Sequence, residues 1–173
     1  MRVFICLEIP KEIKKIIKKI QEDLPEFEGK KTEEENLHLT LKFLGEVNSE
    51  ILKKIKESLS KIRFKKFKAK LGKIGVFDDN FVRIVWIKVE NCNDLQKEID
   101  ENLYDIFEKE RRFISHLTIA RVKKLKNKND FLRKLELIEF SKNDFLVDSF
   151  YLKESILTKE KPIYTNLGVY FLS

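Results

Sequence analysis

The sequence has few cysteines and no long apolar run. Cys6 and Cys92 are the only cysteines in 173 residues, too few for a disulfide framework and without the spacing of metal ligands. We therefore expect two buried, reduced thiols in a cytoplasmic protein. No apolar stretch approaches the length that a membrane helix needs, and residues 1–9 lack the flanking pattern of a signal peptide. We expect no contact with a membrane.

Several arrangements that carry chemistry in other proteins are also absent. The sequence has no cluster of carboxylates or histidines with metal-ligand spacing. It has no glycine-rich phosphate loop, and glycine itself is scarce, with 5 residues. No serine or cysteine is accompanied by the partners of a nucleophilic triad. We therefore expect a protein that uses neither a metal nor a cofactor.

Charged residues are plentiful, and their balance is basic. Lys and Arg number 36 against 29 Asp and Glu, which gives a formal net charge of +7 at pH 7. A positive balance favours polyanionic partners such as nucleic acids or phosphate esters. Enrichment in Lys and Glu also occurs in proteins of hot environments. The charge alone therefore does not identify RNA as the partner.

Histidine occurs only twice, and both copies lie in one short pattern. The pattern occupies residues 38–41 (His-Leu-Thr-Leu) and 116–119 (His-Leu-Thr-Ile). Residues two apart in a strand share a face, so each segment predicts a half-buried strand with an imidazole and a hydroxyl on one face. A single His-x-Thr has a high risk of arising without a function. Two copies that use every histidine favour a functional pair.

The order of the expected elements repeats along the chain. Apolar spacing predicts strands at 2–8, 36–44, 64–76, 82–89, 116–122, 143–148, 150–157 and 163–172, and helices at 11–24, 51–62, 93–107 and 129–138. In both halves a strand and a helix precede the His-Leu-Thr strand, and a helix and a strand follow it. We therefore predict one bilobal domain over 1–173, with an internal duplication at approximately 1–80 and 81–173.

This repeated order predicts an α+β fold with two pseudo-symmetric lobes. Each lobe would be an antiparallel sheet with helices on its outer face. The two sheets would face one another across a central cleft and bring His38 and His116 to it. A face that carries His, Thr and Lys suits the lining of a wet cleft better than a dry core.

Two histidines in one cleft are the equipment of acid–base catalysis. An imidazole titrates near about pH 6.5, so one ring can be neutral while the other is charged. The neutral ring accepts a proton and the charged ring donates one. The hydroxyls of Thr40 and Thr118 can hydrogen-bond oxygens on which charge builds up. A metal-free reaction at phosphorus fits this set of groups.

The residues around the two motifs extend the pattern to a known family. They are residues 2–4 (Arg-Val-Phe), 36–45 (Asn-Leu-His-Leu-Thr-Leu-Lys-Phe-Leu-Gly), 116–121 (His-Leu-Thr-Ile-Ala-Arg), Ser155 and Tyr164. Over essentially its whole length the sequence resembles the two-histidine phosphoesterases, and most closely the RNA 2',3'-cyclic phosphodiesterases, also called 2'-5' RNA ligases. The paired motifs are highly specific for the superfamily, and the extended first motif is specific for the subgroup.

The resemblance implies hydrolysis of RNA 2',3'-cyclic phosphate ends to 2'-phosphomonoesters, with 2'-5' ligation as the reverse reaction. His116 matches the family's proton acceptor, which activates water. His38 matches the proton donor to the departing 3' oxygen, and Thr40 and Thr118 match the hydroxyls that hold the phosphate. We expect a monomer whose partner is RNA with 2',3'-cyclic phosphate termini.

The contacts to the rest of the substrate are less well defined. Arg121 belongs to the family pattern and could bind phosphate bidentately, yet strict alternation places it on the Leu117 face, away from the histidines. Either a β-bulge turns it toward the site or it has a structural role. Family members often carry Arg and aromatic residues before the first motif and Pro before the second histidine. Here residues 29–32 (Gly-Lys-Lys-Thr) and Ser115 stand there, which puts the preferred substrate length in doubt.

Two other functions are compatible with the same motifs. One is a cyclic phosphodiesterase that acts on small nucleotides such as ADP-ribose 1'',2''-cyclic phosphate, an alternative known within the superfamily. The other is a non-catalytic module that binds RNA ends. Binding alone does not require two titratable groups, so intact copies of both motifs favour an enzyme. Comparing turnover of a mononucleotide and an oligoribonucleotide distinguishes the two enzymes.

Overall fold

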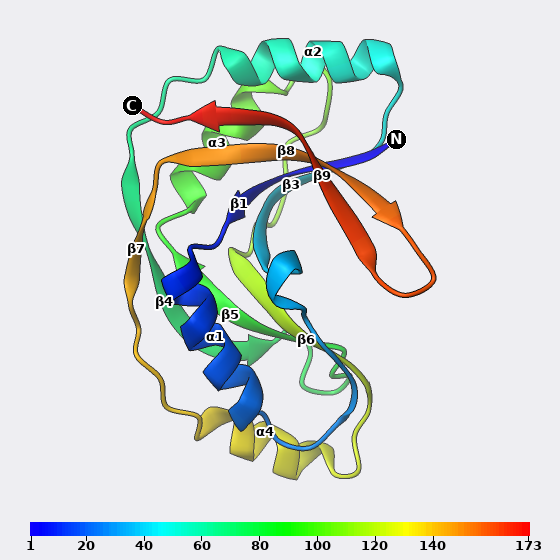
Figure 1. The fold of residues 1–173 in the computed structure, drawn as a ribbon, viewed down its shortest axis with the longest axis vertical. Coiled ribbons are helices and arrows are strands. Elements are labelled where there is room, and N and C mark those ends of the chain that lie inside the picture. The colour runs from blue at the N-terminus through cyan, green and yellow to red at the C-terminus, as the bar shows by residue number, and fades with distance from the viewer.

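A computed structural model describes the whole chain, from Met1 to Ser173 (Figure 1). In chain order its elements are β1 (Arg2–Glu8), α1 (Lys11–Asp23), β2 (Glu28–Lys31), the 3₁₀ turn η1 (Glu34–Asn36), β3 (His38–Glu46), α2 (Ser49–Ser60), β4 (Phe67–Val76), β5 (Ile84–Glu90), α3 (Asn93–Asn102), β6 (His116–Lys124), α4 (Lys128–Glu136), β7 (Asp144–Val147), β8 (Ser149–Leu157) and β9 (Pro162–Phe171).

The order of these elements agrees with the periodicity of the sequence, and one helix is shorter than expected. The third helix was predicted to run to residue 107, but α3 ends at Asn102. Its N-cap is Cys92, and no side chain caps it. After α3 the chain returns to the helix, and the backbone N–H of Glu110 donates a hydrogen bond of 2.9 Å to the side chain of Asp100.

All nine strands belong to a single sheet. Its order is β7-β4-β5-β6-β3-β1-β8-β9, with β2 paired to β6 as well. Every pairing is antiparallel. The expected α+β fold is confirmed, and the two predicted sheets are joined into one continuous antiparallel sheet. They join through one contact between the motif strands β3 and β6.

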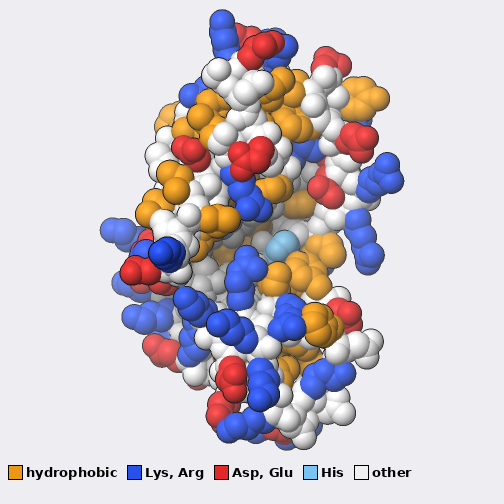
Figure 2. All heavy atoms as spheres, turned by 90° about the vertical axis from the view of Figure 1, so that its right-hand side faces the viewer, with side chains coloured by type: hydrophobic (Ala, Val, Ile, Leu, Met, Phe, Trp, Pro, Cys, Tyr) orange, Lys and Arg blue, Asp and Glu red, His pale blue; other side chains and the backbone are white.

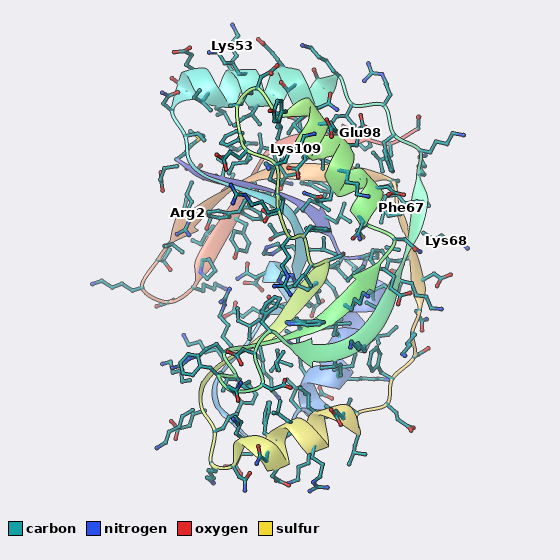
Figure 3. The ribbon with its side chains drawn as sticks, turned by 180° about the vertical axis from the view of Figure 1, so that it is seen from behind. Arg2, Lys53, Phe67, Lys68, Glu98 and Lys109 are labelled. Atoms are coloured by element: carbon teal, nitrogen blue, oxygen red, sulfur yellow. The ribbon has the colours of Figure 1, made fainter.

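Two lobes lie on either side of this junction (Figure 1). One lobe contains β1, β3, β8 and β9 with α2 and α3, and the other contains β4 to β7 with α1 and α4. The helices cover the outer faces, and polar side chains such as Lys53 on α2 point to solvent (Figure 3). The lobes interleave the two halves of the chain, since α1 packs on β6 and α3 packs on β3.

The outer face of the sheet carries the hydrophobic core. One cluster of 36 buried side chains runs through both lobes and includes Leu39 and Leu117, the residues behind the two histidine motifs. The two cysteines are buried and unpaired, as expected. Burial raises the pKa of Cys6 to about 12 and that of Cys92 to about 11, so both stay protonated at neutral pH. No helix is long and apolar enough to cross a membrane.

Candidate active site

The two histidine motifs meet where the lobes join. Leu39 of β3 pairs with Leu117 of β6 in an antiparallel register. Antiparallel geometry therefore sets His38 beside Thr118, and Thr40 beside His116. All four polar side chains lie on the face opposite the two leucines. The histidines form a diagonal pair, and such pairs are roughly 7–8 Å apart, which leaves room for one phosphate group between the rings.

A cleft opens here because β3 and β6 diverge beyond their single contact. The edge of β6 next pairs with β2, from Ala120 to Lys124. The cleft has a volume of about 520 Å³ and is lined by all five predicted site residues, His38, Thr40, His116, Thr118 and Arg121. Ser155 and Tyr164, two other residues of the family pattern, line it too. Figure 2 shows an imidazole in a hollow of the surface, with lysine and arginine side chains beside it.

A bulge in β3 changes which side chains enter the cleft. Thr40 pairs with Cys6 and Lys42 pairs with Ile5, so Leu41 is an extra residue in β3. The bulge reverses the alternation beyond it. Lys42 is consequently buried among the outer helices, while Phe43 lines the cleft and is 52% exposed.

A matching bulge in β6 places Arg121 in the cleft. Thr118 pairs with Trp86 and Ala120 pairs with Val85, so Ile119 is the extra residue. Beyond it Arg121 emerges on the side of the histidines and lines the cleft. Of the two interpretations of Arg121 that alternation left open, the bulge is therefore the one that the structure contains.

Gln21 of α1 holds the β6 bulge from behind. Its buried side-chain amide donates hydrogen bonds of 2.9 Å to the carbonyl oxygens of Ile119 and Thr32. The backbone N–H of Thr32 also donates to the Ile119 carbonyl, at 2.9 Å. The bulged residue and the end of β2 are thus fixed to each other. This set of three hydrogen bonds, here called the Gln21 clip, fixes the position of Arg121 on β6 and of Lys31 on β2.

A buried ion pair and its hydrogen bonds hold the β3 bulge. The ammonium group of Lys42 forms an ion pair with Asp100 of α3 and donates to the Glu108 carbonyl at 2.8 Å. Asp100 also accepts from the Gln96 amide at 2.8 Å and from the Glu110 backbone N–H at 2.9 Å. Burial opposes the charge of Asp100, but these hydrogen bonds outweigh it and lower the pKa of that carboxyl. Each motif strand is therefore tied to a helix at its bulge.

The two imidazoles are oriented by identical backbone contacts. Nδ1 of His38 lies 2.7 Å from the carbonyl oxygen of Asn36, and Nδ1 of His116 lies 2.7 Å from that of Ile114. A carbonyl accepts a hydrogen bond, so Nδ1 carries a hydrogen in both rings. Nε2 is left as the nitrogen free to exchange a proton with a bound molecule. When neutral it accepts a proton there, and when charged it donates one.

The two rings differ in their surroundings. His38 is enclosed by Phe4 and Tyr164, whose ring centroids lie 5.1 Å and 5.0 Å from its own. Burial lowers the pKa of His38 below its ordinary value of 6.5, against the opposing effect of the Asn36 carbonyl. Nearby positive charges, including Arg121, lower it further. His38 is therefore biased toward its neutral form in the free protein.

His116 has a more open environment on the other lobe. Phe77 meets its ring edge to face, with centroids 4.8 Å apart, and Trp86 lies 6.4 Å away. Phe77 follows β4 directly and is 46% exposed. Sequence analysis did not single out Phe77, because nothing in its local pattern distinguishes it from the other 13 phenylalanines.

The cleft is strongly cationic. Its charged lining residues are Arg2, Lys30, Lys31, Arg121 and Lys161, against the carboxylates Glu33 and Glu160. Figure 3 shows Arg2 on the side of the molecule from which the β8–β9 hairpin projects. Lys30 and Lys31 belong to the segment that departs from the family pattern, and β2 brings both to the cleft. Lysines therefore stand in this cleft where family members often use arginines before the first motif.

The tip of the β8–β9 hairpin is fastened across the cleft. Lys161 lies 2.8 Å from Glu33 and 2.5 Å from Glu35, forming two ion pairs. Lys30 in turn donates to the Glu160 carbonyl at 3.4 Å. These contacts join the end of the chain to the segment before the first motif. The sequence offered no signal for them, because Lys161 is one of 36 basic residues.

The structure contains no group of three or more His, Cys, Asp and Glu side chains placed to hold a metal ion. The polar atoms that converge in the cleft are imidazole nitrogens, hydroxyls and cationic groups. These groups suit an anion. Negatively charged oxygens are the chemistry that donors and cations of this kind stabilise.

The fold and the site together define a phosphoesterase built from two repeats. The sequence pattern of the family described as LigT like Phosphoesterase matches residues 7–86 and again residues 87–164. The chain belongs to this family. The resemblance to two-histidine phosphoesterases that the motifs indicated is thereby confirmed.

Named relatives match nearly the whole chain. A protein of Methanocaldococcus jannaschii named RNA 2',3'-cyclic phosphodiesterase is 41% identical, covering 95% of this chain and 96% of its own length. A protein of the same name from Archaeoglobus fulgidus is 38% identical and covers 98% and 99%. The crystal structure of E. coli LigT in its apo form is 25% identical, with a TM-score of 0.81 over 99% of this chain and 97% of that one.

Proposed function

We propose that this protein hydrolyses 2',3'-cyclic phosphate ends of RNA to 2'-phosphomonoesters. The observation that carries the proposal is the equivalent anchoring of His38 and His116 in one cationic cleft. Each ring presents Nε2 to the same space, which is the requirement for a base and an acid on opposite sides of one phosphorus atom. The names of the full-length relatives support the same substrate.

The reaction needs two proton transfers. Nε2 of neutral His116 accepts a proton from water as the water oxygen bonds to phosphorus. The bond from phosphorus to the 3' oxygen breaks, and Nε2–H of His38, whose charged form is favoured once the anionic phosphate is bound beside it, donates a proton to that oxygen. The product carries a 2'-phosphate and a 3'-hydroxyl. Afterwards His116 is charged and His38 is neutral, and exchange with solvent restores both.

The remaining groups bind the phosphate. Thr40 and Thr118 each lie beside a histidine, so their hydroxyls donate to the non-bridging oxygens on which charge accumulates. Arg121 supplies a planar guanidinium that pairs with two phosphate oxygens. The imidazoles carry out both proton transfers, so the proposed mechanism requires no metal ion. All of these residues come from one chain, and we propose that a monomer is the active unit.

Ligation uses the same groups in the same roles. A ribose hydroxyl replaces water and loses its proton to His116 as it bonds to phosphorus, the bond to the 3' oxygen breaks, His38 protonates that oxygen, and a 2'-5' linkage results. Only when that linkage is cleaved back to the cyclic phosphate do the roles exchange: His38 then accepts the proton of the 3'-hydroxyl and His116 donates one to the departing oxygen, as microscopic reversibility requires. In water the high concentration of the competing nucleophile favours hydrolysis.

The position of the phosphate in the product tests the proposal. An oligoribonucleotide with a 2',3'-cyclic end is incubated with the protein, and the product is analysed by ³¹P NMR and by digestion that distinguishes 2'- from 3'-phosphates. We expect only the 2'-phosphate, at a rate unchanged by a chelator. A 3'-phosphate product, an unopened ring or a rate restored only by a divalent ion would contradict the mechanism.

A further inference from the structure

Two exposed aromatic rings belong to the loop that contributes Phe77 to the surroundings of His116. Phe77 is 46% exposed and Phe81 is 60% exposed, and both belong to the loop between β4 and β5. Exposed hydrophobic side chains that cluster, rather than occurring singly, mark binding surfaces. Figure 2 shows hydrophobic side chains gathered next to the imidazole in the hollow, with cationic side chains adjoining them.

Phe77 is a rigid part of this surface. Its ring packs on Trp86 with centroids 5.5 Å apart and a tilt of 41°, and it meets the His116 ring at 4.8 Å. Trp86 is itself confined, because a Cβ on Gly75 would lie 2.8 Å from its ring. A ring held on two sides loses little conformational entropy when a ligand packs on its remaining face.

Phe81 is accompanied by a cation. The guanidinium carbon of Arg83 lies 4.2 Å from the centroid of the Phe81 ring. The guanidinium is fixed in turn by a hydrogen bond from Nη1 to the Lys123 carbonyl, at 2.8 Å. An aromatic ring and an adjacent arginine are the two groups on which unpaired bases stack in proteins that bind single strands. The loop thus offers two aromatic rings and a cation on the lobe that carries His116.

We propose that Phe77 and Phe81 form a stacking platform for unpaired bases of an RNA end. Phe77 touches His116, so it receives the base of the nucleotide that carries the cyclic phosphate. Phe81, four residues further along the loop, receives the base of the preceding nucleotide. The inference rests on the proposed function and specifies its substrate as single-stranded RNA, in preference to a small cyclic phosphate. Every base has an apolar face, so the platform accepts any sequence.

Leucine substitutions test the platform, since leucine keeps the apolar volume and removes the aromatic face. We expect Phe81→Leu to lower kcat/KM for an oligoribonucleotide with a 2',3'-cyclic end on the order of ten-fold. Its effect on a mononucleotide 2',3'-cyclic phosphate is smaller, because that substrate has no preceding base. Phe77→Leu lowers kcat/KM for both substrates. An equal loss on the two substrates in Phe81→Leu, or no loss in either variant, overturns the proposal.

Phe171→Leu is the matched control. Phe171 is 79% exposed and lies on β9, the edge strand of the other lobe, so this variant removes an exposed ring that does not contact His116. We expect its kcat/KM to equal that of the wild type for both substrates. Far-ultraviolet circular dichroism and thermal unfolding establish that all three variants fold.

A binding measurement separates this proposal from the proposed function. Trp86 is the only tryptophan and is in contact with Phe77, so its fluorescence reports a base that stacks there. An oligoribonucleotide ending in a 2'-phosphate should change this fluorescence saturably, and about ten-fold more weakly when annealed into a blunt duplex. If the protein hydrolysed no cyclic phosphate but gave this result, the proposed function would fail and the platform would stand. No fluorescence change, or a change that follows self-association of the protein, overturns the platform.

Discussion

At the scale of single residues, the two histidines have the same backbone anchor in different surroundings. The Asn36 and Ile114 carbonyls fix the two rings in the same tautomer. His38 is enclosed by aromatic rings, whereas His116 is bordered by a partly exposed one. The pseudo-symmetry of the fold therefore supplies two equivalent nitrogens, and the neighbouring side chains make their chemistry unequal.

Removing either imidazole should nearly abolish turnover. We expect His38→Ala and His116→Ala each to lower kcat by about two to four powers of ten, because each removes one proton transfer. The double variant should lose far less than the product of the two losses, since groups that act as a unit are non-additive. Steady-state kinetics on a cyclic-phosphate oligoribonucleotide measures all three. Near-normal turnover in a folded single variant would leave a binding module as the better interpretation.

The pH dependence of kcat/KM should be bell-shaped. One histidine must be charged and the other neutral, so activity falls on both sides of an optimum, and the limbs belong to the coupled pair. Burial lowers the pKa of His38 below 6.5, so we expect one limb below pH 6.5. A pH–rate profile from about pH 4.5 to 9 measures this. A flat profile, or a single limb, is incompatible with paired acid–base work.

At the scale of elements, helices determine where the strand side chains point. Strict alternation in β6 would turn Arg121 away from the cleft, and the bulge at Ile119 turns it inward. Bulges disrupt the regular hydrogen bonding of a ladder, and Gln21 supplies partners for the carbonyls at this one. In β3 the charged pair of Lys42 and Asp100 lies at the corresponding place. The site thus depends on polar side chains buried behind it.

Replacing Gln21 should weaken substrate binding through Arg121. Gln21→Met keeps the length of the side chain and removes two hydrogen bonds, leaving the Thr32 carbonyl unpaired at a cost of about 1–3 kcal/mol in unfolding free energy. We expect KM to rise roughly ten-fold with a smaller change in kcat, as expected for a lost phosphate contact. In an Arg121→Ala background the same change should add little to KM, which a double-mutant cycle measures.

Gln96→Met provides the matched control for that cycle. Gln96 is also a buried helical glutamine, 3% exposed, and it donates to Asp100 instead of to the β6 bulge. We expect it to destabilise the protein without coupling to Arg121. If the effects of Gln21→Met and Arg121→Ala on KM were fully additive, the hydrogen bonds of Gln21 would stabilise the protein without positioning Arg121.

At the scale of the whole molecule, part of the net positive charge is located at the cleft. The net charge is +7, and the cleft lining has five cationic side chains against two carboxylates. Lys30 and Lys31 are both exposed on β2, near the histidines. The basic balance is therefore concentrated in part at the site and is not spread evenly over the surface.

Binding of RNA should weaken as salt rises. If about three phosphates are neutralised, log Ka against log salt has a slope of roughly −2 for a single strand. Fluorescence titration of an oligoribonucleotide ending in a 2'-phosphate, at several KCl concentrations, measures it. The Lys30→Gln/Lys31→Gln variant should flatten the slope, whereas Lys53→Gln/Lys56→Gln, which removes the same charge from exposed positions of α2, should not. Equal slopes in both variants would mean that Lys30 and Lys31 contribute no more to RNA binding than lysines elsewhere on the surface.

Stability should also depend on His38. Its pKa is lower in the folded than in the unfolded chain, so the folded state binds fewer protons. The part of the unfolding free energy that depends on neutral His38 is fully present above about pH 6.5 and is lost as the pH falls through the folded pKa. Urea unfolding between pH 7 and 5 should show a decline in unfolding free energy that is shallower in His38→Gln. An identical decline in both proteins would mean that burial of His38 does not contribute.

Local patterns were sufficient for much of this protein. Alternation at residues 38–41 and 116–119 identified the two motif strands, their polar faces and the leucines behind them. Apolar spacing located the helices, because a helix that packs on a sheet buries residues three or four positions apart. The scarcity of histidine drew attention to the two residues that both line the cleft. These features depend on residues close together in the chain.

Other features depend on segments that are far apart in the sequence, and only the tertiary structure decided them. The bulges at Leu41 and Ile119 arise from register with β1 and β5. The pairing of β2 with β6 brings Lys30 to the cleft, and the hairpin tip brings Lys161. A one-residue shift in register reverses every side chain beyond it. The amino acid at a position therefore does not decide to which face of the sheet its side chain points. Strand pairing decided that Arg121 faces the histidines and that Lys42 does not.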